Sequence, residues 1–347
     1  MDNVRILGHS AVRAALRDTE TYSSDLQGDA DVRNYRQIPL EVDPPRHHLY
    51  RSALAPIFVR PKIQSLESNF AQLAQKILGD FSKNGGGDFI GEVALKYVIG
   101  CLGEIYDRQQ DVAEWLSWGP DVWTADKHGR SGEKLHSYLD RVYEEVQNTD
   151  TSDVWNFVAN LEIGGQKIGY EEFKGIAGVL LAGGRDTVVK LLTGCAWHFV
   201  RNPQDGKAIL SGEASLENAI QEILRVFTPL PAMLRVTEDQ KHLSDTERDP
   251  AKFIAVDFAS ANYDSEVFEN PEQIDIYRKR IPHLSFGFGP HTCIGSHIAE
   301  TEAKVLLGQI LPIIETWHFD HEPEIAWQEV GTTNFPERFL TMQISVN

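Results

Sequence analysis

The chain has few cysteines, and no two of them stand at the spacing of a redox or metal-binding motif. Cys101, Cys195 and Cys293 form an odd and widely separated set. Such a set offers no disulfide framework and suits a reducing compartment. We therefore expect a cytoplasmic protein without structural disulfides.

Basic charge and long apolar runs are also scarce. With 33 basic against 51 acidic residues the formal net charge is -18, which opposes nonspecific nucleic-acid binding. No run of about 18 apolar residues occurs, and the first residues, Met1 to Arg5, lack the apolar stretch of a signal or an anchor. We expect a soluble protein with no nucleic-acid partner and no membrane contact.

Linker sequences and internal repeats are missing as well. The hydrophobic share of 41% is typical of a globular chain, and length alone is only a soft guide to the number of domains. The short run Gly85, Gly86 and Gly87 is interpreted as a loop. We predict one continuous domain over residues 1–347.

Apolar residues recur mainly with the period of an α-helix. No proline occurs between Pro120 and Pro203, which leaves room for long helices. The pattern predicts a helix over about 135–146, one long apolar helix over about 170–202, and another helix over about 215–227. The buried face of the first would consist of Leu135, Tyr138, Leu139, Val142, Tyr143 and Val146.

The alternation of a half-buried strand is found in only two places. Residues 253–256 are one candidate, and the other lies at the C-terminus, where apolar and polar residues alternate over Leu340, Met342, Ile344 and Val346. The expected fold class is therefore mainly α with a minor β component.

The most informative stretch surrounds Cys293. Three glycines and Pro290 crowd the loop at residues 286–295. A helix is predicted to follow and to end before Pro312, with a buried face of Ile294, Ile298, Val305 and Leu306. Cys293 thus lies where a loop meets a helix N-terminus, and there backbone N–H groups and the helix dipole favour a thiolate.

Three roles are open to this cysteine from its surroundings alone. One cysteine cannot complete a tetrahedral zinc site, and His291, two residues away, is poorly spaced to help. A single axial thiolate suits haem iron, where it donates electron density that favours O–O cleavage. The remaining alternative is a buried structural cysteine in a glycine-rich turn.

The loop matches, without a gap, the haem-binding signature of the cytochrome P450 family at Phe286, Gly289, His291, Cys293 and Gly295. The chain resembles this family over nearly its whole length, from about Val4 to the C-terminal strand. The resemblance implies a cytochrome P450 fold, with haem b between a long central helix and the helix after the cysteine loop. It also implies that Cys293 is the iron ligand and that Phe286, Gly287 and Gly295 contact the cofactor.

The long predicted helix contains two adjacent glycines, Gly183 and Gly184, each of which costs about 1 kcal/mol relative to alanine inside a helix. Such a pair indicates close approach of a ligand or a local widening of the helix, with helix–helix packing as the alternative. The following Arg185, Asp186 and Thr187 complete a resemblance to the family's oxygen-activation motif, which implies a proton relay through Asp186 and Thr187. Because adjacent helical residues do not share a face, we expect Arg185 to point away from the haem and not to neutralise Asp186.

Glu222 and Arg225 are three residues apart, so that both lie on one helix face where an ion pair can form. Solvated pairs at this spacing are common, but here the pair resembles the family's Glu-x-x-Arg motif. In that motif the two residues are structural and tie their helix to the loop before the cysteine. A match to that loop is found at Asn262, Tyr263, Asp264, Phe268, Pro271, Asp275 and Arg278.

Burial of the two haem propionates requires cationic partners. The family positions with that role match His47, Arg51, Arg235 and His291. His47 and Arg51 are four residues apart on one helix face, and the preceding Asp43, Pro44 and Pro45 predict the start of this helix with Asp43 as its N-cap. A surface charge is the alternative for each residue taken singly.

The resemblance is incomplete at the N-terminus. Residues 8–16 resemble a helix that lies some tens of residues into typical members, so we expect the first helix and part of the first sheet to be missing. Residues 103–170, which normally cover the substrate pocket, are compact. The expected pocket residues are Val179, Leu180, Gly183, Gly184, Leu230, Pro231, Ala232, Met233, Thr332 and Thr333.

The resemblance implies a monooxygenase that inserts one oxygen atom from dioxygen into a small hydrophobic substrate, such as a terpenoid, an aromatic or a lipid fragment. The chain contains no flavin or iron–sulfur domain, so electrons are expected from a separate ferredoxin and its NAD(P)H-dependent reductase. Two alternatives stay open. A peroxygenase would use hydrogen peroxide and would not need Asp186 and Thr187, and a non-catalytic haem protein would bind carbon monoxide but form no product.

Overall fold

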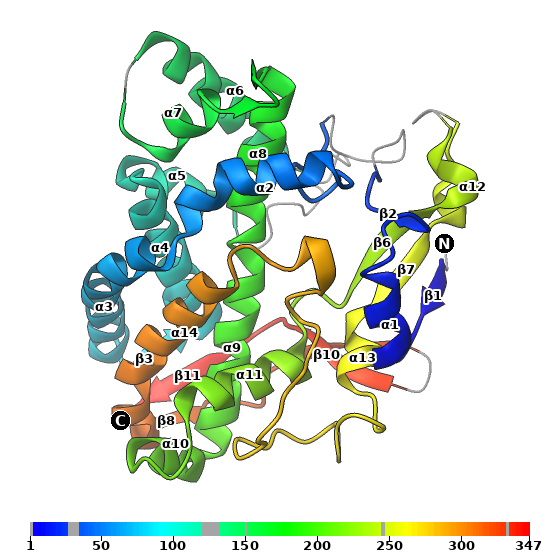
Figure 1. Cartoon of the computed structure of the whole chain (residues 1–347). Helices are drawn as coiled ribbons and strands as arrows, with labels where there is room; N and C mark the ends of the chain where they lie inside the picture. Colours follow the sequence, from blue (N-terminus) through cyan, green and yellow to red (C-terminus); the bar gives the residue numbers. More distant parts are fainter. Residues whose placement is uncertain (1–2, 27–34, 120–131, 150, 244–246, 331–332) are drawn as a thin grey trace.

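The computed structural model describes residues 3–26, 35–119, 132–149, 151–243, 247–330 and 333–347 (Figure 1). Helices dominate these residues, and the strands form four small sheets. The expected class, mainly α with a minor β component, is confirmed. No helix in the described ranges combines the length and the apolar character needed to cross a membrane.

The helices run in chain order as α1 (His9–Ala15), α2 (Arg46–Leu54), α3 (Arg60–Lys83), α4 (Lys96–Tyr106), α5 (Val112–Ser117), α6 (Glu133–Asn148), α7 (Val154–Ala159), α8 (Tyr170–Gly183), α9 (Asp186–Arg201), α10 (Pro203–Leu210), α11 (Leu216–Phe227), α12 (Glu238–Lys241), α13 (Phe258–Asn262) and α14 (Ser296–Ile310). Figure 1 shows α8 and α9 end to end through the centre of the molecule, with α14 beside them.

The largest sheet has the strand order β1–β7–β6–β2. In it β1 (Val4–Ile6) runs parallel to β7 (Ile254–Asp257), whereas β6 (Ala232–Thr237) is antiparallel to β7 and to β2 (Tyr22–Ser23). A second sheet places β11 (Gln343–Val346) between β3 (Gly86–Asp88) and β8 (Trp317–Phe319). Two hairpins complete the set, namely β4 (Glu162–Ile163) with β5 (Gln166–Lys167), and β9 (Ile325–Val330) with β10 (Thr333–Phe339).

Three of the helices predicted from periodicity are confirmed. The first is α6, which buries its apolar stripe at Leu135, Tyr138, Leu139, Val142 and Val146. The second is α11, where the Ser215 hydroxyl caps the helix by accepting the N–H of Asn218 at 3.2 Å. The third is α14, which ends at Ile310 shortly before Pro312.

The prediction of one long helix over about 170–202 is wrong, because the helix breaks at Gly184 and Arg185 into α8 and α9. Side chains satisfy carbonyl groups next to the break. The Tyr106 hydroxyl donates to the carbonyl of Leu180 at 2.8 Å, and the Thr187 hydroxyl donates to that of Gly183 at 2.9 Å. The low helix propensity of two glycines and these alternative donors together explain why the chain leaves the helix here.

Two smaller expectations about strands are also corrected. Gly86, expected in a loop, begins β3 and pairs with Ser345. Its φ of +107° lies in the region that favours glycine, and the backbone of β11 leaves no room for a Cβ atom. At the C-terminus the strand begins only at Gln343, and Leu340 lies outside it with 45% of its surface exposed.

The predicted N-cap of the helix that carries His47 is wrong as well. α2 begins at Arg46, with Pro45 in the cap position and no side-chain cap. The carboxylate of Asp43 instead accepts hydrogen bonds from the Ser23 hydroxyl at 2.5 Å and from the Ser24 N–H at 2.8 Å. Asp43 therefore binds the end of β2 and the residue that follows it, and it does not cap the helix.

A fully buried ion pair on α11 connects the helices to the segment that leads to Cys293. Arg225 donates from Nη2 and Nε to the two carboxylate oxygens of Glu222 at 2.8 and 2.9 Å. The same guanidinium donates to the backbone carbonyls of Asn262, Pro271 and Gln273. Burial alone would raise the pKa of Glu222, but hydrogen bonds from Arg225 and Arg278 hold it below the usual value.

Replacing Arg225 with Leu should lower the free energy of unfolding by about 3–5 kcal/mol, because it leaves the Glu222 carboxylate buried without its main partner. Urea unfolding at pH 7 measures this. Arg141→Leu, which removes an exposed arginine paired with Glu114, is the control and should cost about 1 kcal/mol or less. Since the depressed pKa makes the Glu222 contribution complete only above about pH 4.3, the difference should shrink on acidification below that pH. Equal losses at pH 7 in the two variants would contradict the structural role of Arg225.

Candidate functional site

One large cavity lies where α2, α4, the break between α8 and α9, β6 and the cysteine loop meet. It encloses about 1470 Å³ of space that no protein atom occupies, part of it continuous with solvent. The residues predicted to bind the cofactor all line it: His47, Arg51, Arg235, Phe286, Gly287, His291, Cys293 and Gly295.

The cysteine loop is a closed backbone turn that presents Cys293 to the cavity. The N–H of Cys293 donates to the carbonyl of Phe286 at 2.8 Å, and the N–H of Gly287 donates to that of Leu284 at 2.8 Å. At Gly289 φ is +74°, and a Cβ atom there would lie 2.6 Å from the carbonyl oxygen of Leu16. The loop can therefore pack against the end of α1 only with glycine at this position.

Within the cavity Cys293 has an accessible side chain, although protein surrounds it on most sides. Burial raises the pKa of its thiol, against the opposing effects of the Gly295 N–H and the Arg51 guanidinium. The Gly295 N–H thus acts in the predicted direction, but burial outweighs it, and α14 begins three residues after the cysteine, at Ser296. A thiolate here needs an additional positive charge, and a bound metal ion is one that thiolates accept.

Two imidazoles and two guanidiniums converge at one edge of the cavity, and none of them forms an ion pair with a described carboxylate. The rings of His47 and His291 have centroids 4.1 Å apart, and neither ring nitrogen of His47 nor Nε2 of His291 has a hydrogen-bond partner among the described residues. Arg51 and Arg235 donate only to backbone carbonyls, those of Thr292 at 2.8 Å and Leu234 at 2.7 Å. We name this set, His47, Arg51, Arg235 and His291, the cationic cradle.

The pKa values of the cradle show how strongly these groups are held away from water. Burial, together with the charge of Arg51, lowers the pKa of His47 to about 4. Burial also lowers the pKa of Arg235 to about 10, although Asp43 opposes the shift. An anion between these side chains would satisfy the unpartnered nitrogens and stabilise the charged forms.

These observations test which cofactor the residues fit. A thiol, a cationic edge with unpartnered ring nitrogens and an apolar wall suit a large, mainly apolar cofactor that carries anionic groups and a metal ion. Haem has this combination, with two propionates for the cradle and iron for Cys293. The residues present fit the cofactor that the sequence motif implies.

The break between α8 and α9 forms the opposite wall of the cavity. Gly183, Gly184 and Thr187 line it, and Gly183 has no protein atom within contact distance of the position where a Cβ would lie. Asp186 is not among the lining residues, and its side chain is 20% exposed. The alcohol of the expected acid–alcohol pair therefore faces the cavity, and the acid lies behind it.

The expectation for Arg185 is half wrong. The residue does not line the cavity, as expected, but its Nη1 forms an ion pair with Oδ1 of Asp186 at 2.8 Å. It also donates to the backbone carbonyl of Gly119. The argument from helical geometry fails because Arg185 lies in the break, where adjacent side chains are no longer separated by a regular helical turn.

The predicted substrate-pocket residues fall into two groups. The cavity is lined by Val179, Leu180, Gly183, Gly184, Leu230 and Met233. Pro231, Ala232 and Thr333 do not line it. The carbonyl of Pro231 accepts the N–H of Ala259 at 3.0 Å, Ala232 pairs with Asp257 in the sheet, and Thr333 pairs with Val330 in the hairpin. Thr332 lies outside the described residues.

Several lining residues were not foreseen from the sequence. Leu102, Ile105 and Tyr106 come from α4, and Pro39 and Leu40 come from the segment before α2. None of them belongs to a chemical motif. The three residues of α4 share one helix face by their spacing, which is the only signal that could have indicated a common wall.

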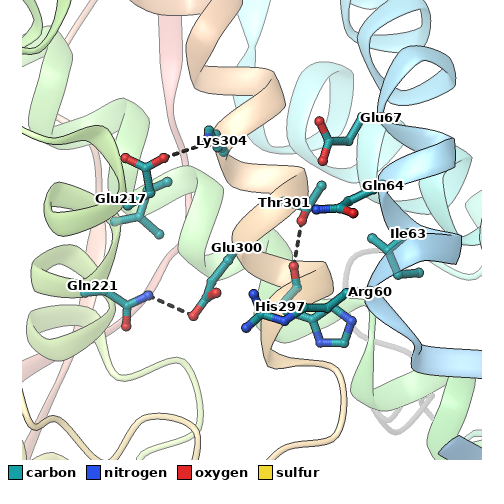
Figure 2. A pocket seen from close by; sticks show the side chains of 11 residues that line it. Arg60, Ile63, Gln64, Glu67, Glu217, Gln221, His297, Glu300, Thr301 and Lys304 are labelled. Carbon is teal, nitrogen blue, oxygen red and sulfur yellow. Dashed lines mark hydrogen bonds and ion pairs between the residues drawn. The ribbon is translucent and has the colours of Figure 1, made fainter.

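A second, polar cleft lies between α3, α11 and α14, away from the predicted site residues (Figure 2). Lys304 pairs with Glu217 at 2.5 Å, and Gln221 donates to Glu300 at 2.8 Å. Arg60 and Glu67 approach from α3. Its charges are of both signs, which is typical of a solvated groove.

Comparison with known proteins gives a consistent result. The family model described as "Cytochrome P450" matches residues 215–324, which include α11 and the cysteine loop. A protein of Sinorhizobium fredii described as "Probable cytochrome P450 127A1" is 27% identical over 305 residues, 86% of this chain and 73% of that protein. A steroid C26-monooxygenase of Mycolicibacterium smegmatis is 28% identical over 284 residues, 79% of this chain and 66% of its own length.

A solved structure described as "The structure of a carbohydrate active P450" has a similar fold over the full length of the chain. It is 27% identical, with a TM-score of 0.87, and the match covers 100% of this chain and 94% of the other. The match therefore includes the N-terminal residues of this chain.

Replacing Arg235 with Leu should have opposite effects on the protein with and without haem. The haem-free protein should become more stable in urea, because a buried cation without an ionic hydrogen-bond partner is removed. Haem, in contrast, should dissociate about tenfold faster or more, since a charge-assisted hydrogen bond contributes roughly 1.5–3 kcal/mol. Transfer of haem to an excess of an acceptor protein measures the rate. Arg46→Leu, which removes an exposed arginine from the same helix as His47, should leave the rate unchanged, and an unchanged rate in Arg235→Leu would exclude Arg235 from the cradle.

Proposed function

We propose that the chain is a haem-thiolate monooxygenase of the cytochrome P450 family and that it acts on a small, largely apolar molecule. The observation that supports this most directly is the shared cavity, in which an accessible cysteine, the cationic cradle and an apolar wall face one space. The overall reaction consumes dioxygen, two electrons and two protons, and it yields one water and one oxygenated product.

Each part of the cavity has a role in this proposal. Cys293 ligates the iron of haem b, the cradle binds the propionates, and Phe286, Gly287 and Gly295 pack against the ring. The bound haem supplies the activation of dioxygen. The protein provides orientation, excludes bulk water and moves protons.

Proton supply is assigned to Asp186 and Thr187. Thr187 faces the cavity, and its hydroxyl donates to the carbonyl of Gly183, so that its oxygen can accept a hydrogen bond from the cavity side. Asp186 is partly exposed and exchanges protons with solvent, while Arg185 orients its carboxylate. This pair favours a monooxygenase over a peroxygenase, which would not need it.

An apolar substrate is supported by the part of the cavity lining outside the cradle. Its side chains are uncharged and mostly aliphatic: Leu40, Leu102, Ile105, Val179, Leu180, Val188, Leu191, Leu230 and Met233. The relative named as a steroid C26-monooxygenase has a substrate class of this kind. A terpenoid, an aromatic or a lipid fragment would lose little hydration on entering such a space.

A sugar derivative is the second candidate substrate. It is favoured by the solved structure described as a carbohydrate active P450, which matches this chain from end to end. Because the wall is apolar, a sugar would have to present an apolar substituent such as an alkyl ether to the reactive side, with its hydroxyl groups toward the open mouth.

Electrons are proposed to come from a ferredoxin and its NAD(P)H-dependent reductase in the cytoplasm. Although the chain carries a net charge of -18, basic side chains are exposed near the cysteine loop, among them Arg17, which lies over the ring of Phe288, and Arg60, which lines the polar cleft with His297. A small acidic protein would meet favourable charges there.

The reaction itself is tested with the haem-loaded protein, a ferredoxin, its reductase and NADH. A steroid, a monoterpene, a small aromatic and an alkylated sugar are first screened for a shift of the iron spin state. The compound that shifts it is then incubated under ¹⁸O₂. The proposal predicts one ¹⁸O atom in the product for each NADH consumed. Product with hydrogen peroxide but none with NADH would show a peroxygenase, and ordinary carbon monoxide binding without any product would show a non-catalytic haem protein.

Replacing Thr187 with Ala should divert electrons from product to hydrogen peroxide, because the alcohol that faces the cavity is removed. We expect the peroxide formed per NADH to rise several-fold, whereas Thr187→Ser, which keeps the hydroxyl, should stay close to the original protein. Parallel assays of NADH, peroxide and product measure the partition. An unchanged ratio in Thr187→Ala would remove Thr187 from the proton relay.

A further inference from the structure

Thr228 ends α11 in a backbone conformation that a β-branched residue rarely adopts. Its φ of +36° and ψ of +73° lie in the left-handed region. The end of a helix usually has glycine in this conformation, because glycine has no Cβ atom to clash with the backbone. Such strain persists only where the surroundings fix the residue, and it is often found at functional sites. The presence of threonine here therefore calls for an explanation.

The hydroxyl group of Thr228 gives the first part of that explanation. It donates to the carbonyl of Arg225 at 2.7 Å and accepts from the side-chain amide of Asn262 at 2.9 Å. The residue is 1% exposed, so both hydrogen bonds form away from water. Glycine would relieve the strain, but it would leave the buried amide of Asn262 without this acceptor.

The amide of Asn262 extends this contact to the cysteine loop. The same Nδ2 atom donates to the Ser285 hydroxyl at 2.9 Å, and the Ser285 hydroxyl donates to the carbonyl of Leu224 at 2.7 Å. That carbonyl also accepts the N–H of Thr228 at 2.9 Å, which closes a ring of hydrogen bonds. Leu224 and Ser285 both line the cavity. The strained end of α11 is therefore fastened to two residues of the cavity wall.

From Thr228 the chain turns directly into the cavity wall. Pro229 and Leu230 line the cavity, and Leu230 keeps 41% of its surface exposed although its side chain is large and apolar. The strand β6 follows, and it carries the cavity residues Met233 and Arg235. The backbone angles of Thr228 therefore set the direction in which this stretch of wall leaves α11.

A second contact holds the same turn from α9. The Lys190 ammonium group donates to the carbonyl of Pro229 at 3.2 Å, and α9 packs against α11 (Figure 1). Lys190 follows Thr187 by three residues, so the two are neighbours on the surface of α9, and Thr187 lines the cavity. The turn at Pro229 and Leu230 is thus held from α11 by Thr228 and from α9 by Lys190.

We propose that Thr228 is a positioning residue for the substrate, because its strained backbone and its bonded hydroxyl hold Pro229 and Leu230 at one place in the cavity wall. Lys190 supports the same turn from the other side. The inference rests on the proposed function, since it assigns to Leu230 a contact with the apolar molecule in the cavity. A molecule with an apolar group large enough to reach Leu230 is then bound in one orientation, and the wall selects which of its bonds is oxidised.

The position of the wall is tested with two iron ligands of different size, so that no substrate has to be known. Imidazole and phenylimidazole both bind haem iron through a ring nitrogen, but only phenylimidazole adds an apolar ring that fills part of the cavity. Spectral titration of the haem-loaded ferric protein gives the dissociation constant of each. The affinity of phenylimidazole divided by that of imidazole, the size ratio, reports on the apolar wall because iron ligation contributes to both.

Three substitutions of Thr228 separate its hydroxyl from its shape. Thr228→Gly removes both the strain and the hydroxyl, Thr228→Val keeps the shape without the hydroxyl, and Thr228→Ser keeps the hydroxyl. In Thr228→Gly and Thr228→Val the size ratio should fall about tenfold, in line with the loss of a methylene-sized contact in an apolar pocket. Thr228→Ser should stay close to the original protein. A size ratio that is unchanged or higher in both Thr228→Gly and Thr228→Val would overturn the proposal.

A substitution in α9 keeps the test valid if the Thr228 variants fold poorly. Lys190→Met removes the hydrogen bond to Pro229 from the other side of the turn, and it should also lower the size ratio several-fold. Asn270→Gly is the matched control. Asn270 has a positive φ of +47° as well, but it is exposed and does not line the cavity, so the size ratio should not change.

Urea unfolding of the same variants measures the structural contribution of Thr228 separately. If Thr228→Gly, Thr228→Val and Lys190→Met lose stability but keep the size ratio of the original protein, the residues are only structural and the proposal falls. If the original protein has no thiolate-type haem spectrum and binds neither imidazole, the proposed function fails, and the positioning role fails with it. A normal thiolate-type spectrum with a constant size ratio overturns the positioning role alone.

Discussion

The buried ion pair between Glu222 and Arg225 is the constraint on which the position of the cysteine loop depends. Arg225 holds the carbonyl of Asn262, whose side-chain amide in turn accepts the N–H of Leu284 at 2.7 Å and donates to the Ser285 hydroxyl at 2.9 Å. These residues directly precede the loop. The ion pair and these hydrogen bonds therefore fix the turn that presents Cys293 relative to α11. Within the loop itself no charged side chains form an ion pair.

One edge of the cavity is positively charged, whereas the chain as a whole is acidic. Although acidic residues outnumber basic ones by 51 to 33, two guanidiniums and two imidazoles meet at one buried edge, and no described carboxylate pairs with them directly. Such a cluster destabilises the folded chain on its own, and a dianionic cofactor rim would offset that cost. Stability and cofactor binding are thus coupled, as expected for a site that forms around its ligand.

The features that the sequence predicts best are those set by local geometry. Glu222 and Arg225 share a helix face, as do His47 and Arg51, and the glycines around Cys293 form a tight turn, so spacing alone places these groups. Their convergence on one cavity came from the resemblance to a family, because residues as distant as His47 and His291 have no local signal in common.

The errors arise where distant contacts decide local structure. Apolar periodicity is the same for one long helix and for two collinear ones, and the break depends on Tyr106, more than 70 residues before it in the chain. The pairing of Arg185 with Asp186 follows from that break. Gly86 belongs to a strand because β11, at the other end of the chain, pairs with it.

The central claim is that Cys293 ligates haem iron as a thiolate in this cavity. The most direct test is the difference spectrum of the dithionite-reduced, haem-loaded protein with and without carbon monoxide, recorded alongside Cys293→Ser. Our account predicts the strongly red-shifted Soret band of a thiolate-ligated ferrous complex in the original protein and its loss in the variant. A band at the shorter wavelength typical of histidine ligation in the original protein, or a red-shifted band that survives in Cys293→Ser, would contradict it.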